Sequence, residues 1–209
     1  EALFVMHICI DDYLLDIVQN SFEADSSQVE LIVDQTEDRL NCTVRDNGKG
    51  MDAEVRKRVL DPFYTDGKKH AKRKVGLGLP FLSQACEACE GTFALHSEVG
   101  VGTTVEFSFN LAHLDAPPLG DLCATFVILL AHPLAKGFVI RRTISTVKGS
   151  GSYQLDKVEL EDVLGNLTTS GTLNLLKEYV TSQEEDVRQY YVSLDLHKQK
   201  APLSKQQEM

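Results

Sequence analysis

Three pairs of glycines punctuate the first half of the chain, namely Gly48/Gly50, Gly76/Gly78 and Gly100/Gly102. Each pair stands where one predicted element ends and the next begins. Glycine adopts backbone conformations that other residues avoid, and a glycine turn that opens a helix leaves backbone N–H groups free to bind an anion. We therefore expect short helices and strands joined by tight turns, with a candidate phosphate site at the start of a helix.

The spacing of apolar residues predicts the elements between these turns. A helical pattern covers residues 11–25, and alternating patterns over 28–34 and 40–46 predict two strands joined by a polar turn. The chain continues with predicted helices over 53–60 and 79–90, strands over 93–97 and 103–111, a helix ending at 131, a hairpin over 138–145 and 152–155, and helices over 160–164 and 173–180. This order predicts an α+β chain, with a boundary near Pro117 and Pro118.

The composition is that of a soluble globular protein and excludes several classes of partner. Hydrophobic residues make up 43% and charged residues 25% of the 209 residues, and no apolar run approaches the ~18 residues of a membrane helix. The formal net charge of -10 disfavours nucleic acid and anionic membranes as partners. The five cysteines, an odd number, favour free thiols, so we expect a cytoplasmic protein.

Two further features point to phosphate chemistry. Asp16 and Asn20 are four residues apart on the first predicted helix and share a face, where this pair of side chains suits Mg²⁺ better than Zn²⁺. The alternative interpretation of the pair is a solvated helix face. Residues 68–74 are rich in lysine and arginine and predict a basic loop over a phosphate. A P-loop is excluded, because the chain has no Gly-x4-Gly-Lys-Ser/Thr segment.

Cys86 and Cys89 have the spacing of half a zinc site or of a redox pair. They share a predicted helix face with Leu82 and Ala85, and free cysteine is among the most buried residue types. We therefore expect buried core thiols, with a thiol switch as the alternative.

Five segments occur in a specific order, namely 14–24, 46–51, 61–65, 76–79 and 100–103. In this order and spacing they resemble the N box, the adenine-binding box, the F box and the two later glycine boxes of the GHKL ATPases. That superfamily contains gyrase, heat-shock chaperones, histidine kinases and mismatch-repair proteins. The resemblance covers about half of the chain. Within the superfamily, this half is most similar to the ATP-binding domain of histidine kinases.

The resemblance implies a fold and a domain organisation. Residues 7–113 are expected to form an α/β sandwich of the GHKL type, a mixed, mainly antiparallel sheet with helices on one face. Residues 117–197 match no chemical motif, and we expect a small α+β accessory or interaction domain there. Residues 198–209 are polar, and we expect a disordered tail.

The same resemblance implies ATP and Mg²⁺ as cofactors and assigns roles to individual residues. Asn20 would hold Mg²⁺ together with Asp16, and Asp46 would accept a hydrogen bond from the adenine amino group. Gly50 would let the backbone approach the base, and Thr103 would support the same contact. The other implied nucleotide-binding residues are Gly48, Met51, Phe63, Lys74, Gly76, Leu77, Gly78 and Leu79, the last four near the phosphates and Lys74 in a lid over them.

The activity stays open at this point, because the position of Asp16 carries Glu in hydrolysing members of the family and usually Asn in histidine kinases. Asp16 is the candidate catalytic residue that orients or deprotonates the attacking group. We find no histidine acceptor box and no preceding two-helix domain, so the resemblance implies a stand-alone bacterial signalling protein with a phospho-acceptor or protein partner supplied in trans. The alternative is an ATP-gated protein-binding module with negligible turnover. The oligomeric state is open.

Overall fold

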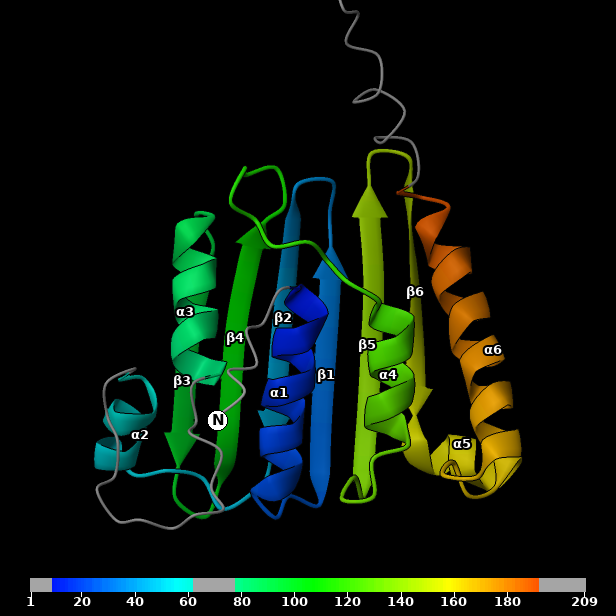
Figure 1. Cartoon of the computed structure of the whole chain (residues 1–209), viewed down its shortest axis with the longest axis horizontal. Coiled ribbons are helices and arrows are strands. Elements are labelled where there is room, and N and C mark those ends of the chain that lie inside the picture. The colour runs from blue at the N-terminus through cyan, green and yellow to red at the C-terminus, as the bar shows by residue number, and fades with distance from the viewer. Residues whose placement is uncertain (1–8, 62–77, 192–209) are drawn as a thin grey trace, which may run out of the picture.

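The computed structural model describes residues 9–61 and 78–191 (Figure 1). The helices are α1 (Ile10–Glu23), α2 (Ala53–Val59), α3 (Gly78–Ala88), α4 (Leu122–Leu130), α5 (Lys157–Leu164) and α6 (Ser170–Arg188), and the strands are β1 (Gln28–Gln35), β2 (Arg39–Asp46), β3 (Thr92–Glu98), β4 (Gly102–Asn110), β5 (Gly137–Thr146) and β6 (Gly149–Asp156). Within the described residues the strands form one sheet in the order β3-β4-β2-β1-β5-β6.

Helices α3, α1, α4 and α6 lie side by side over one face of this sheet (Figure 1). In the part of the chain that the structure describes, four of the five strand pairs are antiparallel and only β1 and β5 run parallel. This arrangement confirms the predicted mixed, mainly antiparallel sheet with helices on one face. Among the helices of the described segments, none has both the length and the apolar character that crossing a bilayer requires.

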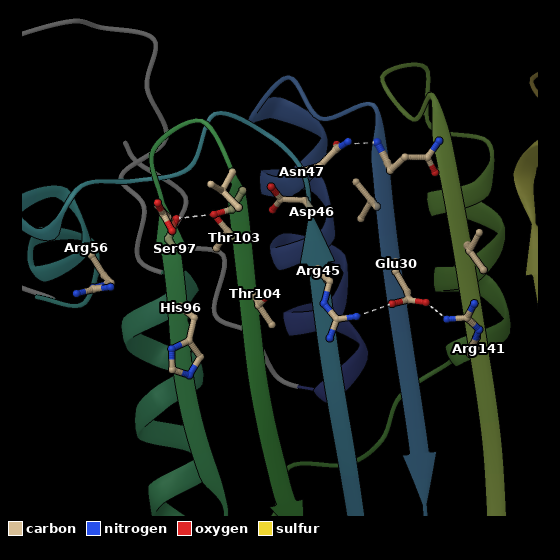
Figure 2. A pocket seen from close by; sticks show the side chains of 16 residues that line it. Glu30, Arg45, Asp46, Asn47, Arg56, His96, Ser97, Thr103, Thr104 and Arg141 are labelled. Atoms are coloured by element: carbon tan, nitrogen blue, oxygen red, sulfur yellow. Dashed lines mark hydrogen bonds and ion pairs between the residues drawn. The ribbon is translucent and has the colours of Figure 1, made fainter.

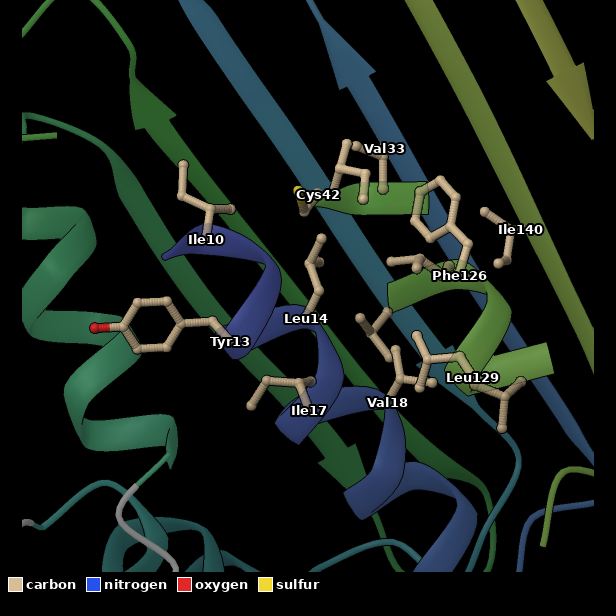
Figure 3. Close-up of a cluster of buried hydrophobic side chains, with 14 of the residues drawn as sticks. Ile10, Tyr13, Leu14, Ile17, Val18, Val33, Cys42, Phe126, Leu129 and Ile140 are labelled. Atoms are coloured by element: carbon tan, nitrogen blue, oxygen red, sulfur yellow. The ribbon is translucent and has the colours of Figure 1, made fainter. Parts of the chain in front are cut away.

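The alternation of side chains in β1 and β2 explains why one face of the sheet is covered. Val33 of β1 pairs with Cys42 of β2, and both side chains are buried on the helix side. Helix α1 presents its own apolar face to them through Ile10, Leu14 and other residues at helical spacing (Figure 3). Each such buried aliphatic side chain stabilises the fold by roughly 1.5–3 kcal/mol.

The second half of the chain continues the same sheet. Strand β5 lies parallel to β1 along its whole length, from the pair Gln28 and Gly137 to the pair Gln35 and Ile144. Phe126 and other buried residues of α4 join the core that α1 and β1 build (Figure 3). Residues 122–191 therefore share one sheet and one hydrophobic core with the first half of the chain. The accessory or interaction role that we expect for residues 117–197 stays a prediction.

The β5–β6 hairpin is confirmed, but its turn is tighter than we predicted. Gly149 and Gly151, which the sequence assigns to the turn, lie in β6. The ring of Tyr190 explains their identity, because a Cβ on Gly151 would approach a ring carbon to 2.8 Å and one on Gly149 to 3.0 Å. Small residues in this strand therefore make room for an aromatic ring and do not form a flexible turn.

A buried ion pair fixes α6 to the sheet. The guanidinium of Arg142 on β5 donates to both carboxylate oxygens of Glu184 on α6, at 3.3 Å each, and the two side chains are 1% and 2% exposed. Arg142 also donates to the side-chain oxygen of Gln35 on β1, and Tyr153 donates to Glu184 at 2.7 Å. Since a charge taken out of water needs partners of this kind, the cluster joins three strands and a helix.

The cluster predicts unequal effects of two substitutions. Glu184→Ala leaves the Arg142 guanidinium buried without its counter-charge, so we expect the free energy of unfolding to fall by about 3–5 kcal/mol. Arg188→Ala removes only the half-exposed partner of Glu184 and should cost less than about 1 kcal/mol. Urea unfolding followed by circular dichroism measures both values. Equal, small losses in the two variants would contradict the anchoring role.

Candidate functional site

Asp46, at the end of β2, presents a buried carboxylate held by two donors. Its Oδ2 accepts a hydrogen bond from the hydroxyl of Ser21 on α1 at 2.8 Å, and its Oδ1 accepts one from the backbone N–H of Gly48 at 2.9 Å. The residue is 8% exposed. The motif that contains Asp46 is visible in the sequence, but the role of Ser21 is not. In the sequence, Ser21 stands out only as a polar residue on the otherwise apolar face of a predicted helix.

The loop after Asp46 is shaped by close backbone contacts. Gly50 has a φ of 63°, and a Cβ at this position would overlap the carbonyl oxygen of Glu98. The backbone N–H of Gly100 donates to the carbonyl of Lys49 at 2.9 Å. Asn47 anchors the other side of the loop, because its side-chain oxygen accepts the N–H of Gln28 at 2.9 Å. The two glycine turns of residues 48–50 and 100–102 thus lie against each other.

Thr103 lies beside Asp46, because β4 pairs with β2 in a register that places the two residues opposite each other. The Thr103 hydroxyl is 2.8 Å from the hydroxyl of Ser97 on β3. Ser97 in turn accepts the backbone N–H of Met51 at 2.9 Å. Ser97 therefore connects the glycine loop to Thr103. The sequence does not reveal this residue, since its role depends on strand register.

Asp16 and Asn20 face the start of α3. The Asn20 amide donates to Asp16 Oδ2 at 3.4 Å, as their spacing on α1 predicts. The Asp16 carboxylate lies so close to Gly78, the first residue of α3, that a Cβ at Gly78 would overlap it. The predicted Mg²⁺ pair and one of the predicted phosphate glycines therefore meet at one point.

A cavity of about 490 Å³ lies beside these residues. Its lining residues are Ile17, Asn20, Ser21, Glu23, Ala24, Asp46, Lys49, Gly50, Met51, Val59, Gly78, Leu79, Thr103 and Val105. The structure thus brings together seven predicted site residues in one cavity: Asn20, Asp46, Gly50, Met51, Gly78, Leu79 and Thr103. Gly48 and Asp16 adjoin it through Asp46 and Gly78. The predicted residues Phe63, Lys74, Gly76 and Leu77, with the basic loop over 68–74, lie outside the described residues.

A larger hollow of about 770 Å³ lies over the opposite face of the sheet and shares Asp46 and Thr103 with the cavity, and Figure 2 shows its polar side chains. Three of its charged groups, Glu30, Arg45 and Arg141, already pair with one another. Glu30 accepts from Arg45 at 3.1 Å and also contacts Arg141. This hollow is wide and polar, so we place the candidate site in the smaller cavity, which combines apolar walls with a few convergent polar groups.

The cysteine pair belongs to the core. Cys86 and Cys89 are 1% and 0% exposed, which confirms the prediction of buried thiols. Burial raises the pKa of the Cys86 thiol to about 12, so thiolate is scarce at neutral pH. Both thiols are thus part of the hydrophobic core, away from solvent.

Residues 10–113 match the model of the histidine kinase-, DNA gyrase B- and HSP90-like ATPases. The chain carries a domain of this family. The matched residues contain the whole cavity, and the fold is the mixed sandwich that the family resemblance implied. We refer to residues 10–113 as the histidine-kinase-like ATP-binding domain.

Curated relatives of this domain are sensor kinases. It is 35% identical over 85 residues to the sensor histidine kinase YxdK of Bacillus subtilis, which covers 40% of this chain and 26% of YxdK. It is 33% identical over 111 residues to the CAI-1 autoinducer sensor kinase/phosphatase CqsS of Vibrio cholerae, which covers 52% of this chain and 16% of CqsS. The chain thus matches about a quarter or less of each relative's length.

Among solved structures, the catalytic domain of the histidine kinase ThkA is similar over 47% of this chain and 64% of its own length, with 19% identity and a TM-score of 0.37. Full-length ShkA in complex with AMPPNP is similar over 49% of this chain and 22% of its own length, with 26% identity and a TM-score of 0.37.

The close contact at Gly50 predicts a measurable difference between two glycines of the domain. Gly50→Ala adds a Cβ against a backbone carbonyl and adopts a positive φ, so we expect a loss of roughly 2–4 kcal/mol in the free energy of unfolding. Gly100→Ala is the matched control, because Gly100 has a φ of 77° but open space around it. It should lose only about 1 kcal/mol. Urea unfolding of both variants is the measurement, and equal losses would contradict the contact.

Proposed function

We propose that this chain binds Mg-ATP in the cavity of the histidine-kinase-like domain and uses it for phosphoryl transfer to a protein or for slow hydrolysis. The observation that carries the proposal is the position of the Asp46 carboxylate beside the cavity. A buried carboxylate, held by Ser21 and Gly48, stands at one side of a cavity whose other side is the start of α3. A purine base and a polyphosphate fit two such ends.

The base end supports an adenine contact. Ile17, Val59 and Val105 supply apolar surface to the cavity, which suits the faces of an aromatic base. An ionised carboxylate accepts hydrogen bonds only, so Asp46 is matched to an exocyclic amino group. Thr103, beside Asp46, adds a hydroxyl to the same contact, and Gly50 and Met51 bring the loop backbone to the base.

The phosphate end is supported by the start of α3. Gly78 and Leu79 open this helix and line the cavity, and a helix start offers free N–H groups and a favourable dipole to an anion. On the family resemblance of their motifs, we assign Gly76 and Leu77 to the same phosphate contacts, Lys74 to the lid and Phe63 to nucleotide binding.

Asp16 and Asn20 fit a magnesium ion by the chemistry of their donors. A carboxylate oxygen and an amide oxygen on one helix face are hard ligands, and they leave positions for water and for phosphate oxygens. Bound Mg²⁺ would neutralise charge on the phosphates. Asp16, next to the start of α3, would orient the attacking group, and such positioning with charge stabilisation is most of what phosphoryl transfer requires.

The names of the relatives favour signalling as the setting, and a cytoplasmic location follows from this proposal. The acceptor of the phosphoryl group would be a protein residue supplied in trans. The alternative, an ATP-gated binding module without turnover, shares the nucleotide site and differs only in the chemistry at Asp16.

The magnesium assignment predicts a ligand-dependent effect. Asn20→Ala removes one oxygen donor, so we expect Mg-ATP to bind at least about tenfold more weakly, while ATP with a chelator changes little. Gln19→Ala removes an amide from the neighbouring position of α1 and should leave both affinities unchanged. Isothermal titration measures all of them. An unchanged Mg-ATP affinity in Asn20→Ala would refute the assignment.

The catalytic assignment predicts a loss of rate without a comparable loss of binding. With γ-labelled ATP, Asp16→Asn should slow turnover at least about a hundredfold, while ATP affinity stays within about threefold. Both free phosphate and label on the protein are followed. Release of phosphate by the unmodified chain indicates hydrolysis, and label on the chain indicates an internal acceptor. Full turnover in Asp16→Asn would refute the role of Asp16, and bound ATP without turnover in the unmodified chain would favour the gated module.

A further inference from the structure

We propose that Ser21 is a positioning residue that sets the preference of the site for an adenine base by fixing the carboxylate of Asp46. This inference rests on the nucleotide binding proposed above. It concerns a residue of the predicted N-box segment, 14–24, to which the sequence alone assigns no role. Its basis is the 2.8 Å hydrogen bond between the Ser21 hydroxyl and Asp46 Oδ2.

The two donors of Asp46 come from different parts of the fold. Ser21 approaches Oδ2 from α1, whereas the backbone N–H of Gly48 approaches Oδ1 from the loop two residues after Asp46. One donor alone leaves the carboxylate free to rotate about its terminal torsion, which is a broad well. Two donors on separate oxygens define the plane of the group. The remaining lone pairs then point in fixed directions.

The orientation of Ser21 is itself determined. Serine within a helix usually bonds its own preceding turn, but the Ser21 hydroxyl crosses to β2. Ser21 is 5% exposed, and its backbone carbonyl accepts the hydroxyl of Ser26, which caps the end of α1. Water therefore competes weakly for this hydroxyl. The hydrogen bond links the position of α1 to the base-recognising carboxylate.

The consequence concerns the hydrogen bond to the base. A hydrogen bond from an amino group to a carboxylate is strong only when the lone pair is aligned with the donor. Without Ser21, Asp46 rotates and the amino group loses most of this bond. A base that lacks the amino group has no such bond to lose. Ser21 should therefore affect the difference in affinity between ATP and a nucleotide without the amino group, and not the affinity for nucleotides in general.

The experiment compares ATP with purine riboside triphosphate, which lacks the amino group, by isothermal titration in Mg²⁺. The unmodified chain should prefer ATP by about tenfold or more, the ratio expected of one hydrogen bond to a charged acceptor. Ser21→Ala should reduce this ratio to about threefold or less, with the affinity for the purine analogue unchanged within about twofold. Ser21→Thr keeps the hydroxyl and should restore the preference.

Ser108→Ala is the matched control, because Ser108 is 3% exposed and bonded to Thr92 but remote from Asp46 in the hydrogen-bond network. It should keep the preference of the unmodified chain. Thermal unfolding checks that each variant is folded, and if Ser21→Ala is not, Ser21→Cys, a weaker donor of similar size, replaces it.

The outcomes separate the two proposals. Failure of the unmodified chain to bind either triphosphate would overturn the proposed function. Binding without a preference for ATP would overturn base recognition by Asp46, and the role of Ser21 with it. A normal preference in the unmodified chain that persists in Ser21→Ala, or an equal loss for both ligands, would overturn the positioning role alone.

Discussion

The packing of α1 against β1 and β2 is the contact on which both the core and the candidate site depend. One face of the helix is buried against the strands through residues such as Leu14 and Val18, which leaves the neighbouring positions no freedom to rotate away. Asp16 and Asn20 are therefore held toward α3, and Ser21 is held against Asp46. Because the same packing stabilises the fold and aims these side chains, a displacement of α1 would disturb both.

The buried polar groups around Arg142 and around Asp46 have different roles. The guanidinium of Arg142 is fully engaged, with Glu184, Gln35 and the carbonyls of Val33 and Thr143 as its acceptors. No donor remains for a ligand, so this cluster is structural. Among the described residues, Asp46 has one donor on each oxygen, and a carboxylate accepts about four hydrogen bonds. Its spare capacity lies beside a cavity, which is the arrangement expected of a binding group.

Much of the site could be predicted because its parts are local. Asp16 and Asn20 share a face by helical spacing. Gly48 and Gly50 come shortly after Asp46, and the roles of all three are implied by motifs in the order that resembles the GHKL ATPases. Ser21 and Ser97 could not be assigned in this way. Ser21 acts on β2, far along the chain, and Ser97 acts through a cross-strand neighbour, so their roles depend on contacts that no local pattern encodes.

The sequence by itself determined most of the elements and the face that most strands bury, because periodicity and turn chemistry are local properties. The order of its motifs carried the family resemblance, which implied the nucleotide-binding residues. Only the tertiary structure decided which strands and which residues lie next to one another. It placed β5 beside β1, so that the second half extends the sheet of the first, and it set Thr103 opposite Asp46. A period of two specifies which way a side chain points but not which strand lies next to it, since strand order and register are set by long-range packing.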